Sequence, residues 1–395
     1  MGLDSLLRAG KKISQGVACA SALLVAVGCS DSKLNKDFKP ACENEVAPYT
    51  QVLSKKELKK ISSSEIGPNT NVIEFLEPTK LKEGEIMISG ITDKAPYGML
   101  KKVTGVSADG KSVYTENATL EEALEYASFE IEVSPPSGEY TRTDNQGNTI
   151  TKKHKAGSLN FKDKQKLVYD LDGNLDTDYD KVHIEIENSF HSRFKLGVEI
   201  QKHKLKELSF RVNADASYSI LVKTDESLQN INDEKRIAHY EFSPFVIGPL
   251  PGTLVPIVVY PEMDIYLSLR GSVSEVKTSI EQESEFSAGI IYNYRTGWRD
   301  EKHLSTDFDF KPPKRPKEFD LTACLRPEIH FLIYKMAGPQ ISAPVSLRVV
   351  DYSGTGSLTA TLETSLGFNP GVFSKQIGGY NQVIFSEDKV LKKWD

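Results

Sequence analysis

The feature that most constrains the fold is an alternation of apolar and polar residues along much of the chain. It is clear in His183–Glu187, Phe194–Ile200 and Tyr218–Val222. Alternation with this period puts one set of side chains on a core and the other in water, so these segments are expected to be β-strands with one covered face. No long helical segment separates them. The sheets are therefore expected to be antiparallel.

Strands with a more apolar composition follow in the second half of the chain. Leu254–Tyr260, Met263–Leu269 and Glu328–Tyr334 are apolar enough for the interior of a sandwich. Residues 135–395, with a sub-boundary near 240, are therefore predicted to form a mainly β domain, either an antiparallel β-sandwich or large twisted sheets. A short repeat is not evident, which disfavours a solenoid or a propeller.

A smaller module is expected before this domain, over residues 71–134. Glu85–Gly90 alternates like a strand, and Asp109-Gly110 supplies the positive φ that a tight hairpin needs. Thr119, followed three residues later by Glu122, has the spacing of a capping box at a helix start. The module is thus predicted to contain a β-hairpin and a short helix.

The N-terminus has the pattern of a secretion signal. Arg8, Lys11 and Lys12 precede the apolar stretch Val17–Val27, which is shorter than the roughly 20 residues of a membrane span. Residues 1–28 are therefore predicted to be a signal peptide. Such a signal places the mature protein outside the cytoplasm.

Ala26–Cys29 resembles the lipobox of bacterial lipoproteins, in which the cysteine receives a lipid and becomes the mature first residue. The resemblance implies acyl chains on Cys29 and a membrane anchor in the bacterial cell envelope. Ala26 departs from the usual Leu, and an ordinary signal peptide with an incidental cysteine is the alternative. By resemblance to the sorting rule of enterobacterial lipoproteins, Ser30 favours the outer membrane, on either face.

Residues 29–70 are expected to form a tether between the anchor and the first module. They are rich in charge, contain Pro40 and Pro48, and show no sustained apolar period. A short helix is expected near their end, with Ser54 as N-cap and Glu57 completing a capping box.

Four cysteines give one testable bond. Cys19 leaves with the signal and Cys29 carries the lipid, so Cys42 and Cys324 remain. An even remainder in an oxidising compartment favours a disulfide between them, and two free buried thiols are the alternative.

Asp170–Asp180 is the best candidate for metal chemistry. Alternate carboxylate and amide oxygens suit Ca²⁺, and the candidate ligands are Asp170, Asp172, Asn174, Asp176 and Asp178. The competing interpretation is a hairpin turn at Asp172-Gly173-Asn174 with the other acids in solvent. Calcium is the only cofactor that the sequence brings into consideration.

Motifs of catalysis are not found. The sequence has no Gly-x-Ser-x-Gly, and its seven histidines lack the His-Glu-x-x-His spacing of zinc peptidases. No catalytic residue is assigned, which favours a protein that is not an enzyme. The alternative of an enzyme stays open in one form, a pair of catalytic carboxylates that a β-sandwich brings together in space.

Aromatic residues and net charge indicate the kind of partner. Tyr294 and Trp298 lie at an expected turn, where exposed rings would stack on sugars or grip a protein. Of the 49 basic and 55 acidic residues, the signal peptide removes three and one, which leaves a mature net charge of −8. A net negative chain does not favour nucleic acid.

The run Ala95–Ser107, continuing into Thr115–Leu124, resembles a module near the N-terminus of many uncharacterised bacterial secreted proteins and lipoproteins. Further segments resemble the later part of the same proteins: Pro251–Met263, Ser287–Tyr292 with Trp298, and Tyr334–Pro339. The resemblance implies a β-rich exported protein and transfers no catalytic residue.

Together these observations predict a lipid-anchored, mainly antiparallel β protein that binds a glycan or a protein at the cell envelope without turning it over. A secreted polysaccharide hydrolase is the first alternative, and a structural component of the envelope is the second.

Overall fold

The computed structural model describes residues 44–394, except 134–136, 145–146, 155–158, 171–180, 225–227, 251–252, 274–275, 312–318, 353–354, 370 and 374–376. Over these residues the chain is mainly β, as predicted. It forms two large antiparallel sheets and one small sheet, here called sheet I, sheet II and the small sheet. Several strands reach 15 to 21 residues, far beyond the usual five or six.

Sheet I has seven strands in the order β1-β7-β11-β12-β16-β17, with β10 also pairing with β11. β7 and β10 share one side of β11 and pair with different halves of it. The strands are β1 (Glu45–Val46), β7 (Leu124–Val133), β10 (Leu159–Asp170), β11 (Lys181–Gln201), β12 (Leu205–Thr224), β16 (Val276–Asn293) and β17 (Gly297–Lys311).

Sheet II has ten strands in the order β19-β21-β20-β18-β15-β13-β8-β9, with β14 on β15 and β22 on β21. They are β8 (Gly138–Asp144), β9 (Thr149–His154), β13 (Leu228–Phe242), β14 (Phe245–Pro249), β15 (Pro256–Val273), β18 (Phe319–Ile333), β19 (Pro339–Ser342), β20 (Val345–Tyr352), β21 (Thr355–Phe368) and β22 (Tyr380–Trp394).

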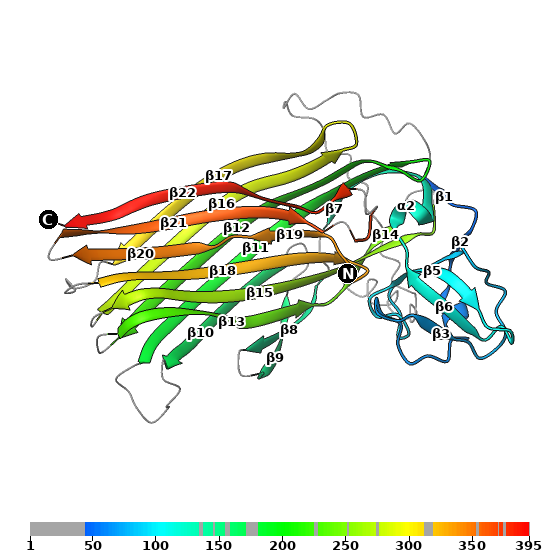
Figure 1. The fold of residues 1–395 in the computed structure, drawn as a ribbon, viewed down its shortest axis with the longest axis horizontal. Coiled ribbons are helices and arrows are strands. Elements are labelled where there is room, and N and C mark those ends of the chain that lie inside the picture. Colours follow the sequence, from blue (N-terminus) through cyan, green and yellow to red (C-terminus); the bar gives the residue numbers. More distant parts are fainter. Residues whose placement is uncertain are drawn as a thin grey trace, which may run out of the picture. The chain divides into compact units, whose positions relative to one another are not determined.

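The two large sheets lie face to face, and in Figure 1 sheet II lies in front of sheet I with the strands of the two layers crossing at an angle. Phe331 of sheet II packs on Phe194 and Phe210 of sheet I, with ring centroids 4.1 and 5.7 Å apart. The alternation seen in the sequence sorts the side chains: Ile184 is fully buried in this core, while His183 is exposed. The face of each sheet that points away from the other is called its outer face below.

The small sheet has the order β2-β4-β5-β6-β3 and carries its own core. Its elements are β2 (Thr50–Val52), α1 (Lys55–Leu58), β3 (Val72–Glu74), β4 (Ile86–Ser89), β5 (Met99–Val106), β6 (Ser112–Asn117) and α2 (Leu120–Ala123). Both predicted capping boxes are present, Ser54 with Glu57 and Thr119 with Glu122. Lys101 of β5 is buried; its Nζ donates to Pro68 O and Asn117 Oδ1, and burial lowers its pKa to about 8.

Part of the predicted tether is folded. Leu58, Ile61 and Ile66 are each 2 % exposed or less and belong to the core of the small sheet. The expected tether over 29–70 therefore extends too far, because these few apolar side chains, scattered among lysines and glutamates, pack into that core while most of their neighbours stay exposed. Residues 29–43 lie outside the described part of the chain.

The inner face of sheet I contains a polar group among its apolar rows. Asn188 of β11 lies directly opposite Tyr218 of β12, and Ser192 follows on the same face. All three are 4 % exposed or less, and their side-chain polar atoms have no hydrogen-bond partner in the described part of the chain. Tyr334, by contrast, is equally buried but donates its hydroxyl to the Pro256 carbonyl.

These two tyrosines make a matched pair. Tyr334→Phe removes a satisfied buried hydrogen bond, so it should lower the free energy of unfolding by about 1 kcal/mol or more. Tyr218→Phe removes a buried hydroxyl without a protein partner and should not lower it. Denaturant unfolding of both variants measures the difference, and an equal loss in the two would contradict the structure of this inner face.

Candidate functional site

Most of the residues singled out by sequence lie outside the described part of the chain. These are Cys29, Cys42, Asp172, Asn174, Asp176 and Asp178, and of Asp170 only the backbone, at the end of β10, is described. Lipidation and the calcium site therefore stay predictions. Cys324 lies on β18, and because Cys42 is outside the described residues, the disulfide between them also stays a prediction.

Trp298 does not lie as expected. It pairs with Tyr292 on the inner side of β17, and its ring packs on Tyr292, Phe368 and Tyr380 at centroid distances of 5.3, 5.5 and 5.0 Å. It is half-buried in the core between the sheets, so the expectation of an exposed ring was wrong. The turn before it is short, and the strand alternation directs Trp298 inward.

Tyr294 is exposed at the turn between β16 and β17, as the sequence analysis expected. Its ring is already in contact with cations, since Lys206 Nζ lies 4.2 Å and Arg295 Cζ 5.2 Å from the centroid. Tyr294 and Trp298 are therefore not part of one aromatic surface.

A polar hollow lies elsewhere, on the outer face of sheet II. It has a volume of about 350 Å³ and is lined by Glu234, Tyr266, Ser268, Arg270, Thr322, Cys324, Arg326 and Ser346. These residues come from β13, β15, β18 and β20, four neighbouring strands of the sheet. This feature is called the sheet II hollow.

The strand register explains why the surface is hollowed here. Ser268, Cys324 and Ser346 lie directly opposite one another on three adjacent strands, so the floor is a row of short side chains. On one side of this row, Tyr266 lies opposite Arg326; on the other, Arg270 lies opposite Thr322. Short side chains bordered by long ones leave a depression without any loop.

Arg326 is held firmly at the rim. It donates to Glu234 and lies 2.9 Å from Glu328, while its guanidinium Cζ is 4.7 Å from the centroid of the Tyr266 ring. Cation–π contact and two carboxylates thus fix both Arg326 and Tyr266. Burial raises the pKa of Tyr266, and the nearby Asp264 charge raises it further.

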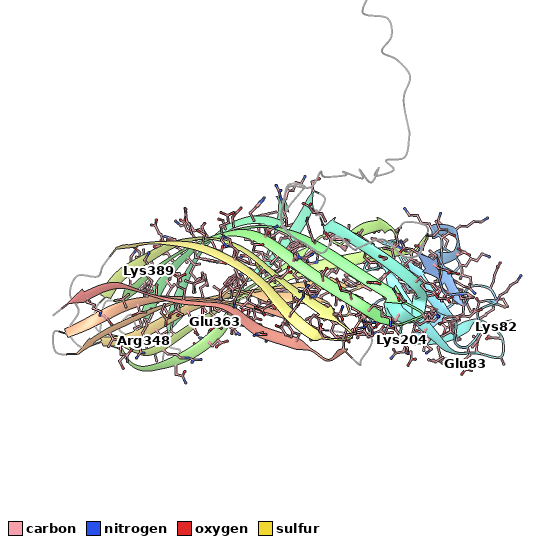
Figure 2. The ribbon with its side chains drawn as sticks, turned by 90° about the horizontal axis from the view of Figure 1, so that it is seen from above. Lys82, Glu83, Lys204, Arg348, Glu363 and Lys389 are labelled. Carbon is pink, nitrogen blue, oxygen red and sulfur yellow. The ribbon has the colours of Figure 1, made fainter. Side chains whose placement is uncertain are left out.

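The rest of the hollow is less constrained. Arg270 contacts Glu234 only at 3.8 Å, and its side chain is 64 % exposed. Burial raises the pKa of the Cys324 thiol on the floor, which keeps it in its neutral form. Arg348, labelled in Figure 2, lies opposite Thr322 on β20 and pairs with Asp320 at 3.3 Å.

A histidine and an aspartate form a second polar group on the same outer face. His239 Nδ1 donates to Asp264 Oδ1 at 2.9 Å, and Arg236 contacts the same oxygen at 3.2 Å. The hydrogen bond to Asp264 raises the pKa of His239. Burial alone would raise the pKa of Asp264, but its bond to His239 and the charges of His239 and Arg236 give a net lowering.

This pair predicts a pH-dependent stability. The folded-state pKa of His239 is raised above its unfolded value of about 6.5, so its contribution is fully present below that pH and is lost as the pH rises through the folded value. His239→Gln should therefore lower the free energy of unfolding more at pH 5.5 than at pH 8.5. Denaturant unfolding at both pH values measures this, and the same loss at each would contradict the assignment.

A third group joins the small sheet to sheet II. Lys335 Nζ lies 4.3 and 4.5 Å from the ring centroids of Tyr97 and Tyr260 and within 3.8 Å of Glu241 and Glu262. Because carboxylates and rings already surround the cation, we interpret this cluster as a structural junction.

Close approach at this junction requires a glycine. Gly98 has φ of +69°, and a Cβ there would lie 2.5 Å from Val258 Cγ2. Tyr334 and Lys335 also adopt left-handed φ values, 52° and 56°, in the turn after β18. The turn places Lys335 over the two rings at the expense of local strain.

Sheet I has a hollow of about 210 Å³ on its outer face. Ser189 and Ser217 form its centre, with hydroxyl oxygens 2.7 Å apart, and Glu187, Glu281 and Glu283 line it. Acids alone do not make a metal site, and in the described part of the chain no cluster of acids, histidines and cysteines could hold a metal ion. The sheet II hollow is therefore the stronger candidate.

Comparison with known proteins adds no family. A scan against models of protein families gives no match, and a search of curated protein sequences gives none either.

The sheet II hollow is not predicted by the sequence alone. Tyr266-Leu-Ser-Leu-Arg270 and Thr322-Ala-Cys-Leu-Arg326 each alternate, and this signal does place Tyr266, Ser268 and Arg270 on one face. It does not show that the two segments lie on adjacent strands. These strands are more than 50 residues apart in the sequence, and only the structure shows that they pair.

Proposed function

We propose that this chain is a lipid-anchored protein of the bacterial cell envelope that binds a glycan, without chemical turnover, in the sheet II hollow. The observation that supports this most is the hollow itself. Its volume of about 350 Å³ lies at the lower end of the range typical of small-ligand sites, roughly 300–1,000 Å³.

The lining favours a sugar over a protein partner. Ser268, Thr322 and Ser346 offer hydroxyls that both donate and accept, and Glu234 and Arg270 offer charged partners for the hydroxyls of a sugar. Tyr266 supplies one aromatic ring. A protein interface would need about 800 Å² on each side with several buried anchors, whereas this hollow is small and Tyr266 is the one aromatic residue in its lining.

The membrane attachment in this proposal rests on Cys29. The described part of the chain contains no helix able to span a bilayer. A lipid on Cys29 would supply the anchor, and Ser30 is the basis for proposing the outer membrane.

The hydrolase alternative requires two carboxylates across an aromatic-lined cleft. Glu241 and Glu262 lie close to Tyr97 and Tyr260, but Lys335 Nζ is 3.8 and 3.7 Å from the two carboxylates. Both carboxylates are thus engaged by Lys335 within the junction described above. A binding function therefore fits the described residues better.

The anchor is tested by intact mass. Protein from native membranes should begin at Cys29 and carry added acyl mass, and Cys29→Ala should lack that mass. An unmodified, freely soluble wild-type product would contradict the lipid anchor.

The binding site is tested by filling the hollow. Full-length protein in detergent should bind members of an immobilised glycan array, and Ser268→Trp, which places an indole on the floor, should weaken that binding by about tenfold or more, the equivalent of about 1.4 kcal/mol.

Ser365→Trp is the matched control, because Ser365 lies on β21 of the same sheet and outside the hollow. Equal binding by the two tryptophan variants and the wild type would place the ligand elsewhere. Both variants should unfold in the same denaturant range as the wild type.

A further inference from the structure

The arginines in and beside the sheet II hollow differ in how closely they approach a carboxylate. On this face Arg326 contacts Glu328 at 2.9 Å, and Arg236 contacts Asp264 at 3.2 Å. Arg348 contacts Asp320 at 3.3 Å. Arg270 reaches its acid only at 3.8 Å, which is the longest of these contacts.

The acid that Arg270 approaches is already engaged. Glu234 accepts a hydrogen bond from Arg326, so one carboxylate serves two guanidinium groups. A guanidinium carries five N–H donors, and one long contact leaves most of them for another partner. The side chain of Arg270 is 64 % exposed, so a ligand can reach it.

The carboxylates at the hollow are taken up mainly by Arg326. Arg270 and Arg326 share Glu234 in the lining, and Glu328 beside it contacts Arg326. Thr322 lies directly opposite Arg270 in the strand pairing, and its hydroxyl lines the same hollow. Planar, bidentate recognition of carboxylate, phosphate or sulfate is what arginine does best.

We infer that the ligand of the sheet II hollow carries an oxyanion, a carboxylate, phosphate or sulfate on the glycan, which binds Arg270 beside Thr322. This inference rests on the proposed function, because it names the class of glycan that the hollow takes. Arg326, fixed by Glu234, Glu328 and the Tyr266 ring, provides a second, preorganised positive charge.

Substitution of these two arginines separates a role in stability from a role in binding. Arg326 has three partners and would lose them all on substitution. Arg270 has one long contact, so its removal should change binding and leave stability nearly unchanged. Arg270 is therefore the residue to substitute.

The test uses matched pairs of oligosaccharides that differ only in charge: glucuronate or galacturonate oligomers with their carboxyl-reduced twins, and a sulfated oligomer with its desulfated twin. Binding to the full-length protein in detergent is measured by calorimetry at 50 and 500 mM NaCl. An acidic member should bind about tenfold or more tightly than its neutral twin, the strength expected of a charge-assisted hydrogen bond. Salt should reduce that advantage.

Arg270→Gln should remove the preference for the acidic member, because it should weaken binding of that member far more than binding of the neutral twin. Arg270→Lys should restore only part of it, because the charge returns without the planar fork. Arg236→Gln is the control, since Arg236 lies on the same face but outside the lining. It removes one charge from the face and should leave the preference intact.

The outcomes separate the two proposals. If twins bind equally, and Ser268→Trp abolishes both, the glycan function stands and the oxyanion inference is overturned. If no member of any pair binds, the proposed function fails and the inference fails with it. If inorganic phosphate alone binds as tightly as the acidic oligomers, the sugar contributes nothing to binding. The inference that the oxyanion is carried on a glycan is then overturned.

Discussion

Phe331 packs against Phe194 and Phe210 across the space between the two large sheets, and the rest of the structure depends on contacts of this kind. An antiparallel sheet with one apolar face is not stable alone in water, so each large sheet needs the other as a cover. Burying a side chain of this size contributes about 1.5–3 kcal/mol. Strands of up to 21 residues repeat such contacts many times, which offsets the entropy of ordering so long a pairing.

Charged pairs that point inward lie at the edges of the two large sheets. β8 pairs with β13 only over residues 238–242, so the earlier part of β13 lies at the sheet edge. Asp233 and Lys235 in that part lie opposite the buried Leu269 and Leu267, so they are on the inner face, and they pair at 2.8 Å. Asp300 and Lys302 are placed in the same way on the inner face of β17, the last strand of sheet I. Inward-pointing charges on edge strands oppose edge-to-edge pairing with another chain. The outer faces are thus left as the surfaces for recognition.

The sequence was sufficient wherever structure is local. Alternation predicted the strands around Ile184, and the spacing of Ser54 and Glu57 predicted a helix start, because both depend on neighbours within a few residues. It was insufficient where a strand partner is distant. Trp298 was judged by its turn, yet the strand β22 that covers it, through Tyr380, begins more than 80 residues later. The hollow depends on β15 and β18 being neighbours, which alternation alone does not specify.

A hollow made by strand register has a consequence for binding. The floor row Ser268, Cys324 and Ser346 and the rim residue Tyr266 are fixed by backbone ladders on both sides, so a ligand need not order a loop in order to bind. Ordering costs are a main reason why buried area fails to become affinity, and sites on rigid elements avoid much of that cost. A shallow site with few contacts can then be selective, because its selectivity comes from the placement of a few groups. Arg270, the least satisfied of those groups, is where that selectivity is expected to arise.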